Sequence, residues 1–117
     1  MKLDTLRHYM LQKNGTTEEQ PFGPEALVFK VVGKMYALIA WQATPLRITL
    51  KCDPDLALSL RNQYTAVQPG YHMNKKHWNT ITLDGTISND EIPNLIDHSY
   101  TLVVKSLKKR EREALGL

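Results

Sequence analysis

Alternation of apolar and polar side chains restricts the fold of this chain more than any other feature of its sequence. The alternation occurs in three successive runs, residues 27–32, 35–41 and 46–51. Gly33-Lys34 predicts a tight turn after the first run, and a short loop ending at Pro45 precedes the third. In the second run, the alternation groups Tyr36 with Leu38 and Ala40. Because successive strand side chains point to opposite faces, the pattern predicts an antiparallel meander with one face in the core.

The face of this meander that points away from the core is predicted to be partly basic. In the third run, aliphatic side chains occupy one side, and Arg47 and Lys51 occupy the other. Lys30 alternates with apolar neighbours in the first run, which places it on the same outward side. No Asp or Glu occurs between Ala26 and Cys52. A one-sided positive field attracts polyanions, although lysine and threonine are also usual on the wet face of an ordinary antiparallel sheet.

Helices and shorter strands are predicted before and after the meander. The first helix starts near Asp4 as its N-cap and ends at Asn14-Gly15, and a loop follows over residues 16–25. Asp53-Pro54 starts the second helix. The remaining elements are an extended segment 67–70, a strand 80–83, a helix beginning near Pro93 with Ser88 and Glu91 as a capping box, and a frayed tail over 108–117. Together they predict one α+β domain over residues 1–117, an antiparallel sheet with helices packed on one face.

The composition is that of one folded domain. With 117 residues, of which 42% are hydrophobic, the chain has enough apolar side chains to bury a core. No apolar run approaches the roughly 20 residues that cross a bilayer, and the first residues mix acid and base where a signal peptide is apolar. We therefore expect a cytoplasmic protein with no membrane partner. Cys52, the single cysteine, can form no internal disulfide and no thiolate metal cage.

Familiar enzymatic patterns are missing from the sequence, so we expect no catalytic residue, no metal and no cofactor. His72 and His77 are five residues apart, whereas two metal ligands on one helix face are four apart, and no carboxylates accompany them. The glycines are isolated and form no phosphate-binding loop. Cys52 ends an apolar strand directly before a helix, where a buried thiol is expected to be inert.

One further stretch, residues 71–79, combines cations, aromatic rings and side-chain amides without any acid. Lys75 and Lys76 offer ammonium groups to phosphates. Asn74 offers hydrogen bonds to a base edge or a sugar, and Trp78 offers a ring for stacking. The same residues also fit structural roles, with Trp78 in the core and with Asn74 and His77 bonding backbone groups of a tight turn. Both interpretations stay open on the sequence alone.

A family resemblance rests on this stretch. The segment His72-Met73-Asn74-Lys75-Lys76-His77-Trp78, together with residues 82–85 and 97–100, resembles the MmcQ/YjbR family of small bacterial proteins. The resemblance implies a compact α+β fold, similar to frataxin-type and secretion-chaperone-type sandwiches and to a double-wing DNA-binding domain. Families of this kind are commonly labelled DNA-binding, which implies duplex DNA as a partner. The positions that match the family motif are His72, Asn74, Lys75, His77 and Trp78.

These observations lead to one function hypothesis and two alternatives. The leading hypothesis is a non-enzymatic protein that binds double-stranded DNA through the basic sheet face and the turn at 72–78. Its predicted contact residues are Lys30, Arg47, Lys51, His72, Asn74, Lys75, Lys76, His77 and Trp78. The first alternative is a protein-interaction or chaperone-like module that docks a partner segment, or a second copy of the chain, on the same sheet; an apolar exposed patch surrounded by the lysines would favour it. The second alternative is an enzyme with a small-molecule site at His72, Asn74 and His77, which convergence of those side chains in a closed pocket would favour.

Overall fold

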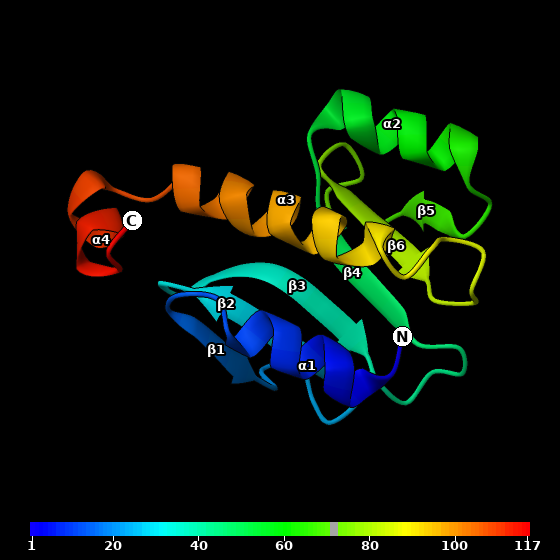
Figure 1. The fold of residues 1–117 in the computed structure, drawn as a ribbon, viewed down its shortest axis with the longest axis horizontal. Coiled ribbons are helices and arrows are strands. Elements are labelled where there is room, and N and C mark those ends of the chain that lie inside the picture. The colour runs from blue at the N-terminus through cyan, green and yellow to red at the C-terminus, as the bar shows by residue number, and fades with distance from the viewer. Residues whose placement is uncertain (71–72) are drawn as a thin grey trace.

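Six strands of the described residues form one antiparallel sheet, in the order β1-β2-β3-β4-β6-β5 (Figure 1). The structure is a computed structural model that describes residues 1–70 and 73–117. The strands are β1 (Thr16–Glu19), β2 (Ala26–Val31), β3 (Lys34–Ala40), β4 (Arg47–Lys51), β5 (Val67–Pro69) and β6 (Trp78–Thr82). The helices are α1 (Leu3–Leu11), α2 (Pro54–Gln63), α3 (Glu91–Lys105) and α4 (Lys109–Ala114). This arrangement confirms the predicted α+β fold.

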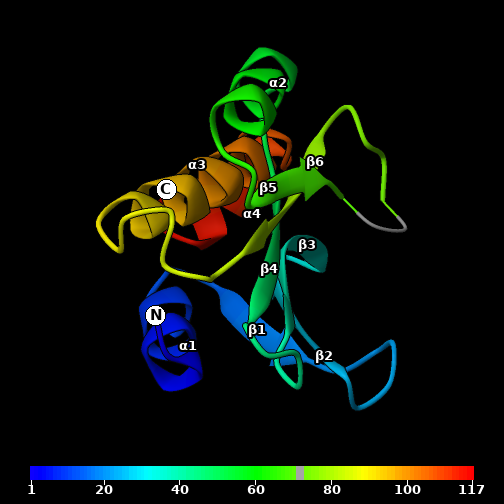
Figure 2. The ribbon, with the colours of Figure 1, turned by 90° about the vertical axis from the view of Figure 1, so that its right-hand side faces the viewer.

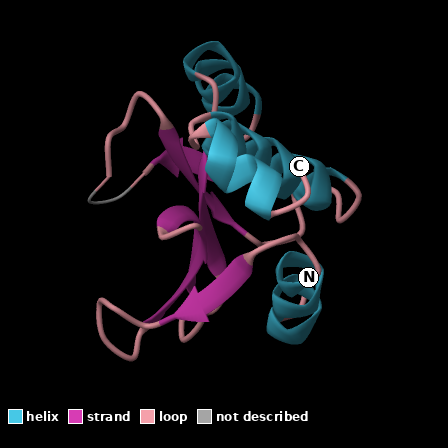
Figure 3. Ribbon diagram, turned by 90° about the vertical axis from the view of Figure 1, so that its left-hand side faces the viewer, coloured by secondary structure: helices cyan, strands magenta, loops and turns pink. Residues whose placement is uncertain are grey.

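The helices lie on one side of the sheet, and the opposite side carries no helix in the described part of the chain (Figures 2 and 3). Strand registers place Ile39 opposite Ile48, and Ile48 opposite Ile81, on the helix-covered side. These three side chains are buried and form one core with Leu6 of α1 and Ile96 of α3. Side chains that alternate with them point to the uncovered side, here called the open face.

A bulge in β3 turns the Tyr36 side chain to the helix-covered side of the sheet. The pairing of β2 with β3 shifts register, and Tyr36 is the extra residue of β3. Its side chain is fully buried, and its hydroxyl lies 2.9 Å from Thr16 Oγ1 and 3.3 Å from the Met10 carbonyl oxygen. The alternation that grouped Tyr36 with Leu38 and Ala40 is therefore wrong at this position, because the bulge turns the tyrosine ring toward the helices.

Ser99 of α3 completes the hydrogen bonding beside this bulge. The pairing of β3 with β4 ends at Ala37 and Leu50, one step before Tyr36 and Lys51. At that step the Lys51 amide donates to the Ser99 hydroxyl (2.9 Å), which donates to the Tyr36 carbonyl (2.5 Å). The buried hydroxyl therefore takes the place of a direct bond between the two strands.

The predicted loop at 16–25 was wrong in its first half, because residues 16–19 form β1. This strand pairs with β2 at the edge of the sheet. Its Glu18 faces α1, where Arg7 Nε and one terminal guanidinium nitrogen donate to the two carboxylate oxygens at 2.6 and 2.9 Å. The side of β1 that faces the helix is thus held by an ion pair and not by apolar side chains. Because β1 lacks apolar alternation, the sequence pattern did not predict it.

Other element ends also differ from prediction. Helix α1 begins at Leu3, so Asp4 lies in its first turn and is not its N-cap. The tight turn between β2 and β3 is centred on Val32 and Gly33, which both have positive φ, as a two-residue hairpin turn requires. In the tail that was expected to fray, α4 forms and Leu115 packs against the core.

Of the two remaining helices, α2 has a side-chain cap at its N-terminus and α3 has none. At α2 the prediction is confirmed, since the Asp53 carboxylate accepts from the Asp55 amide at 3.0 Å and proline occupies the first turn. At α3 the predicted capping box is wrong. The helix begins at Glu91, and the Ser88 hydroxyl accepts from the Asp90 amide at 3.1 Å.

Candidate functional site

The open face of the sheet is hollowed between two projecting segments. The loop between β1 and β2 (residues 20–25) and the segment before β6 (residues 73–77) both extend away from the helices (Figure 2). Between them lies a groove with a volume of about 890 Å³, here called the open-face groove. Concave sites of this size are the usual places where proteins bind ligands, so this groove is the candidate functional site.

Two rows of side chains, aligned by the strand registers, form the floor of the open-face groove. One row is Leu38, Thr49 and Thr80, and the other is Ala40, Arg47 and Thr82. The Thr49 and Thr80 hydroxyls are hydrogen-bonded to each other at 2.8 Å. The rows are two residues apart along each strand, a separation of roughly 6.6 Å. The floor therefore offers hydroxyls, small apolar groups and one guanidinium.

Apolar side chains from both projecting segments flank this floor. Phe22, from the loop between β1 and β2, lines the groove and is 67% exposed. Pro69 of β5 and Met73, with the amide side chain of Gln68, line it on the other side. Among the described residues that line the groove, Arg47 alone is charged. The candidate site is thus large, accessible and poor in charge.

The predicted cations of the open face are divided between the groove and its surroundings. Arg47 lies in the groove, and Lys51, at the other end of β4, is roughly 13 Å away along the strand. Lys75 and Lys76 are exposed on the segment before β6. Within residues 1–70 and 73–117, none of these four side chains forms an ion pair. Lys30 differs, because its ammonium group lies 3.4 Å from the Glu19 carboxylate, which offsets its charge.

The turn that precedes β6 uses Asn74 and His77 for its own backbone. The Asn74 side-chain oxygen accepts from the Lys76 amide at 2.9 Å, and the His77 amide donates to the Asn74 carbonyl at 3.2 Å. The His77 carbonyl accepts from the Cys52 amide at 2.7 Å, which ties the turn to the end of β4. Neither Asn74 nor His77 lines the open-face groove. His72 lies outside the described residues.

Trp78 begins β6 and lies opposite Lys51 in the register, one step from the buried Asn79 and Leu50 pair. Strand alternation therefore places the indole on the open face, where its side chain is half-buried. The Trp78 carbonyl accepts from the Gly70 amide at 2.8 Å. A Cβ atom on Gly70 would lie 2.8 Å from the Trp78 Cβ, so a side chain at position 70 would displace the tryptophan.

Arg61 of α2 holds the segment before β6, a role that sequence reasoning did not predict. Its Nε donates to the Asn79 side-chain oxygen at 2.6 Å, and a terminal guanidinium nitrogen donates to the Trp78 carbonyl at 3.3 Å and to the Lys75 carbonyl. Asn79 is 2% exposed and donates in turn to the Ala57 carbonyl. We call these bonds from Arg61 the Arg61 clamp. A cation in the last turn of a helix usually complements the helix dipole, so nothing in the sequence indicates the Arg61 clamp.

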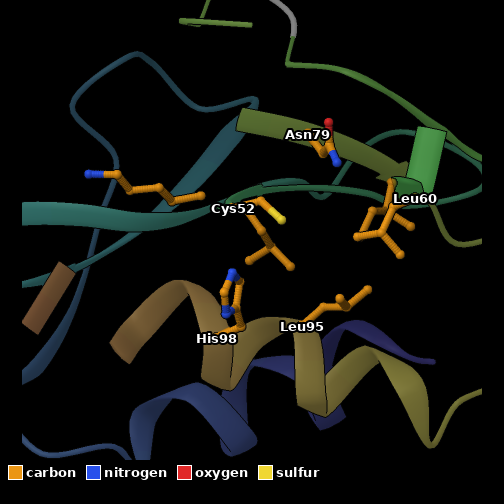
Figure 4. Close-up of a pocket in the computed structure, with 8 residues that line it drawn as sticks. Cys52, Leu60, Asn79, Leu95 and His98 are labelled. Carbon is orange, nitrogen blue, oxygen red and sulfur yellow. The ribbon is translucent and has the colours of Figure 1, made fainter. Parts of the chain in front are cut away.

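A second, much smaller cavity of about 10 Å³ lies between β4, α2 and α3 (Figure 4). Cys52 and His98 line it, and burial raises the pKa of the Cys52 thiol to about 11, so the thiol is protonated at neutral pH. The Nε2 atom of His98 accepts from the Asp53 amide at 3.1 Å. This space is close to the volume of one water molecule, so it cannot hold a substrate.

Among the described residues, no group of three or more His, Cys, Asp or Glu side chains is placed to hold a metal ion. No helix in the same residues has the length and apolar character needed to cross a membrane.

Comparison with known proteins places the chain in a family. The YjbR family model matches residues 11–102. YjbR of Escherichia coli K12, described as uncharacterized, is 32% identical over 98% of this chain and 98% of its own. YbdF of Escherichia coli O157:H7, also described as uncharacterized, is 42% identical over 80% of this chain and 76% of its own.

Solved structures agree with this placement. The crystal structure of the Deinococcus radiodurans protein DR2400 superimposes with a TM-score of 0.93 at 43% identity, covering 99% of this chain and 88% of that one. A Pseudomonas syringae protein matches with a TM-score of 0.74 at 33% identity, covering 87% of this chain and 98% of that one. The resemblance seen in the sequence is thereby confirmed, and the chain belongs to the YjbR family.

Proposed function

We propose that this protein is a non-enzymatic interaction module that docks an extended segment of a partner protein in the open-face groove. One observation carries the proposal. The groove has a volume of about 890 Å³, and its described lining combines exposed apolar side chains with a single charge. An exposed apolar surface is the feature that the first alternative to DNA binding predicts for a protein-interaction module, and the apolar lining of the groove supports it.

The residue types of the groove support a protein partner. Aromatic residues, methionine and arginine are enriched at the centres of protein interfaces, whereas lysine, aspartate and glutamate are depleted there. Phe22, Met73 and Arg47 line the groove, and no lysine, aspartate or glutamate is among its described lining residues. Methionine is also flexible and adapts to differently shaped partners. An extended segment would bury the apolar walls and could bond its backbone to the partly exposed hydroxyls of Thr80 and Thr82.

Peptide selection tests this proposal. A library of random ten-residue peptides displayed on phage is selected on the immobilised protein, and enriched peptides are then measured against variants by fluorescence anisotropy. Leu38→Glu removes an apolar side chain from the groove floor and places a carboxylate beside Arg47, so we expect it to weaken binding at least tenfold, which is about 1.4 kcal/mol.

The matched control is Leu58→Glu, because Leu58 of α2 is 56% exposed and does not line the groove. It should leave peptide affinity unchanged. Thermal melting of both variants verifies that each is folded. Failure to enrich any peptide, or equal binding by the Leu38→Glu variant, would remove protein docking from this surface.

Duplex DNA is a second candidate, favoured by the four cations of the open-face side that lack an ion-pair partner among the described residues. Arg47, Lys51, Lys75 and Lys76 offer their charges to solvent, whereas Arg7 and Lys13 on the helix-covered side are paired with carboxylates. Phosphate binding needs only positive charge near the backbone of the duplex, and it does not require a charged groove floor.

Salt titration tests this second candidate. Labelled mixed-sequence duplex is titrated with the wild type and with a Lys75→Ala/Lys76→Ala variant at several salt concentrations. If both lysines meet phosphates, the slope of log affinity against log salt should become shallower by roughly 2 in the variant. A Lys2→Ala/Lys105→Ala variant removes two other exposed charges and serves as the control. Absence of binding at low salt, or identical slopes for all three proteins, would count against DNA contact through these lysines.

A further inference from the structure

We infer that Arg47 determines the specificity of the open-face groove, and that the docked segment carries a side-chain carboxylate two positions from an apolar side chain. This inference rests on the proposed docking of a protein segment and adds the chemistry of that segment. Two independent features carry it, the guanidinium of Arg47, which has no partner among the described residues, and the spacing of the two floor rows.

Arg47 differs from the arginines that the fold itself employs. The guanidinium of Arg7 binds Glu18, that of Arg61 binds Asn79, and that of Arg112 binds the Leu107 carbonyl at 3.0 Å. Within the described residues, the Arg47 side chain has neither a hydrogen bond nor an ion pair, although it lines the open-face groove. A guanidinium beside apolar walls is the natural partner of a carboxylate, because its planar fork donates two parallel hydrogen bonds.

Charge complementarity therefore selects an acidic segment over a basic or neutral one. No carboxylate lies among the described lining residues of the groove to compete for Arg47. A basic side chain placed over Arg47 would meet like charge in a partly desolvated site, which costs binding energy and rejects such segments.

The floor rows set the spacing. Arg47 shares its row with Ala40 and Thr82, and the neighbouring row contains Leu38. Rows are roughly 6.6 Å apart, which equals the distance between side chains i and i+2 on the same face of an extended chain. Arg47 lies on β4 and Leu38 on the neighbouring β3, roughly 4.8 Å to the side, so a segment that runs obliquely across these strands can place a carboxylate over Arg47 and an apolar side chain over Leu38 at the same time.

The peptide selection described above tests this inference when it is repeated with an Arg47→Glu variant. Wild-type protein is expected to enrich peptides with Asp or Glu two positions from Leu, Ile, Met or Phe. The Arg47→Glu variant is expected to enrich Lys or Arg at the acidic position instead, because the charge of the floor is reversed. For a peptide selected by the wild type, Arg47→Gln should weaken binding about tenfold, as loss of one charged hydrogen-bonded pair predicts.

The outcomes separate this inference from the function on which it rests. Peptides that bind in the groove without any acidic preference would overturn the role of Arg47 and leave protein docking intact. The same would follow if wild type and the Arg47→Glu variant enriched the same peptides. Enrichment of no peptide by the wild type would overturn both. Arg47 is exposed, so all its variants are expected to fold, and their melting curves verify this.

Discussion

Replacing Ser99 by alanine is expected to lower the free energy of unfolding by about 3 kcal/mol. The change removes the hydroxyl that accepts from the Lys51 amide and donates to the Tyr36 carbonyl. Ser99 is 0% exposed, so water cannot replace the hydroxyl without entering the core. Both backbone groups would then be left without a partner beside the bulge, and each such buried group costs roughly 1–3 kcal/mol.

Urea unfolding monitored by circular dichroism measures this loss. Thr101→Ala is the matched control, because Thr101 lies on the same helix and is exposed. The control should change the free energy of unfolding by less than about 0.5 kcal/mol. A loss below about 1 kcal/mol in the Ser99→Ala variant would mean that the strands close over the missing hydroxyl and bond directly.

The second large effect is expected at Arg61, where substitution by alanine should also cost about 3 kcal/mol. The variant leaves the buried Asn79 side-chain oxygen and the Lys75 carbonyl without this donor, whereas the Trp78 carbonyl keeps its bond from the Gly70 amide. Hydrogen bonds from a charged donor are about twice as strong as neutral ones, which places the loss above that of an ordinary surface contact. Faster amide hydrogen exchange over residues 73–78 should accompany the change, because the clamp on that segment is gone.

Two further variants identify the cause. Arg110→Ala removes an exposed arginine of α4 and is expected to leave unfolding and exchange unchanged. Arg61→Lys keeps the charge but replaces the fork with a single ammonium group, so it should recover only part of the stability. If Arg61→Lys matched the wild type in both measurements, the geometry of the guanidinium would be irrelevant and charge alone would account for the effect.

The centre of the fold follows from the sequence because local chemistry and tertiary packing agree there. Alternation predicted β2 and β4, and the pair Asp53-Pro54 predicted the start of α2. The outward position of Arg47 also follows from alternation, and it proved to lie in the candidate site. These features depend on neighbours that are close along the chain, which sequence patterns report well.

Features set by contacts between distant residues could not be predicted in this way. The bulge at Tyr36 lies in the pairing of β2 with β3, and the hydroxyl that bonds its carbonyl comes from Ser99, sixty-three residues later. The clamp by Arg61 depends on Asn79, which α2 meets only in the folded chain. The groove likewise needs Phe22 and a segment more than forty residues later to flank the same floor. The alternation of apolar and polar residues describes one strand at a time, so it does not predict these contacts between distant parts of the chain.

Successive side chains of a strand point to opposite faces of the sheet. The groove floor and the hydrophobic core are therefore chemically separate, although they share the same strands. Leu38 and Thr49 belong to the floor, and their strand neighbours Ile39 and Ile48 belong to the core. Floor residues can therefore be exchanged with little loss of core packing. If the groove binds a partner as proposed, proteins that keep this backbone can diverge in the ligands they accept, and a designer could redirect binding by changing a few floor positions on an unaltered scaffold.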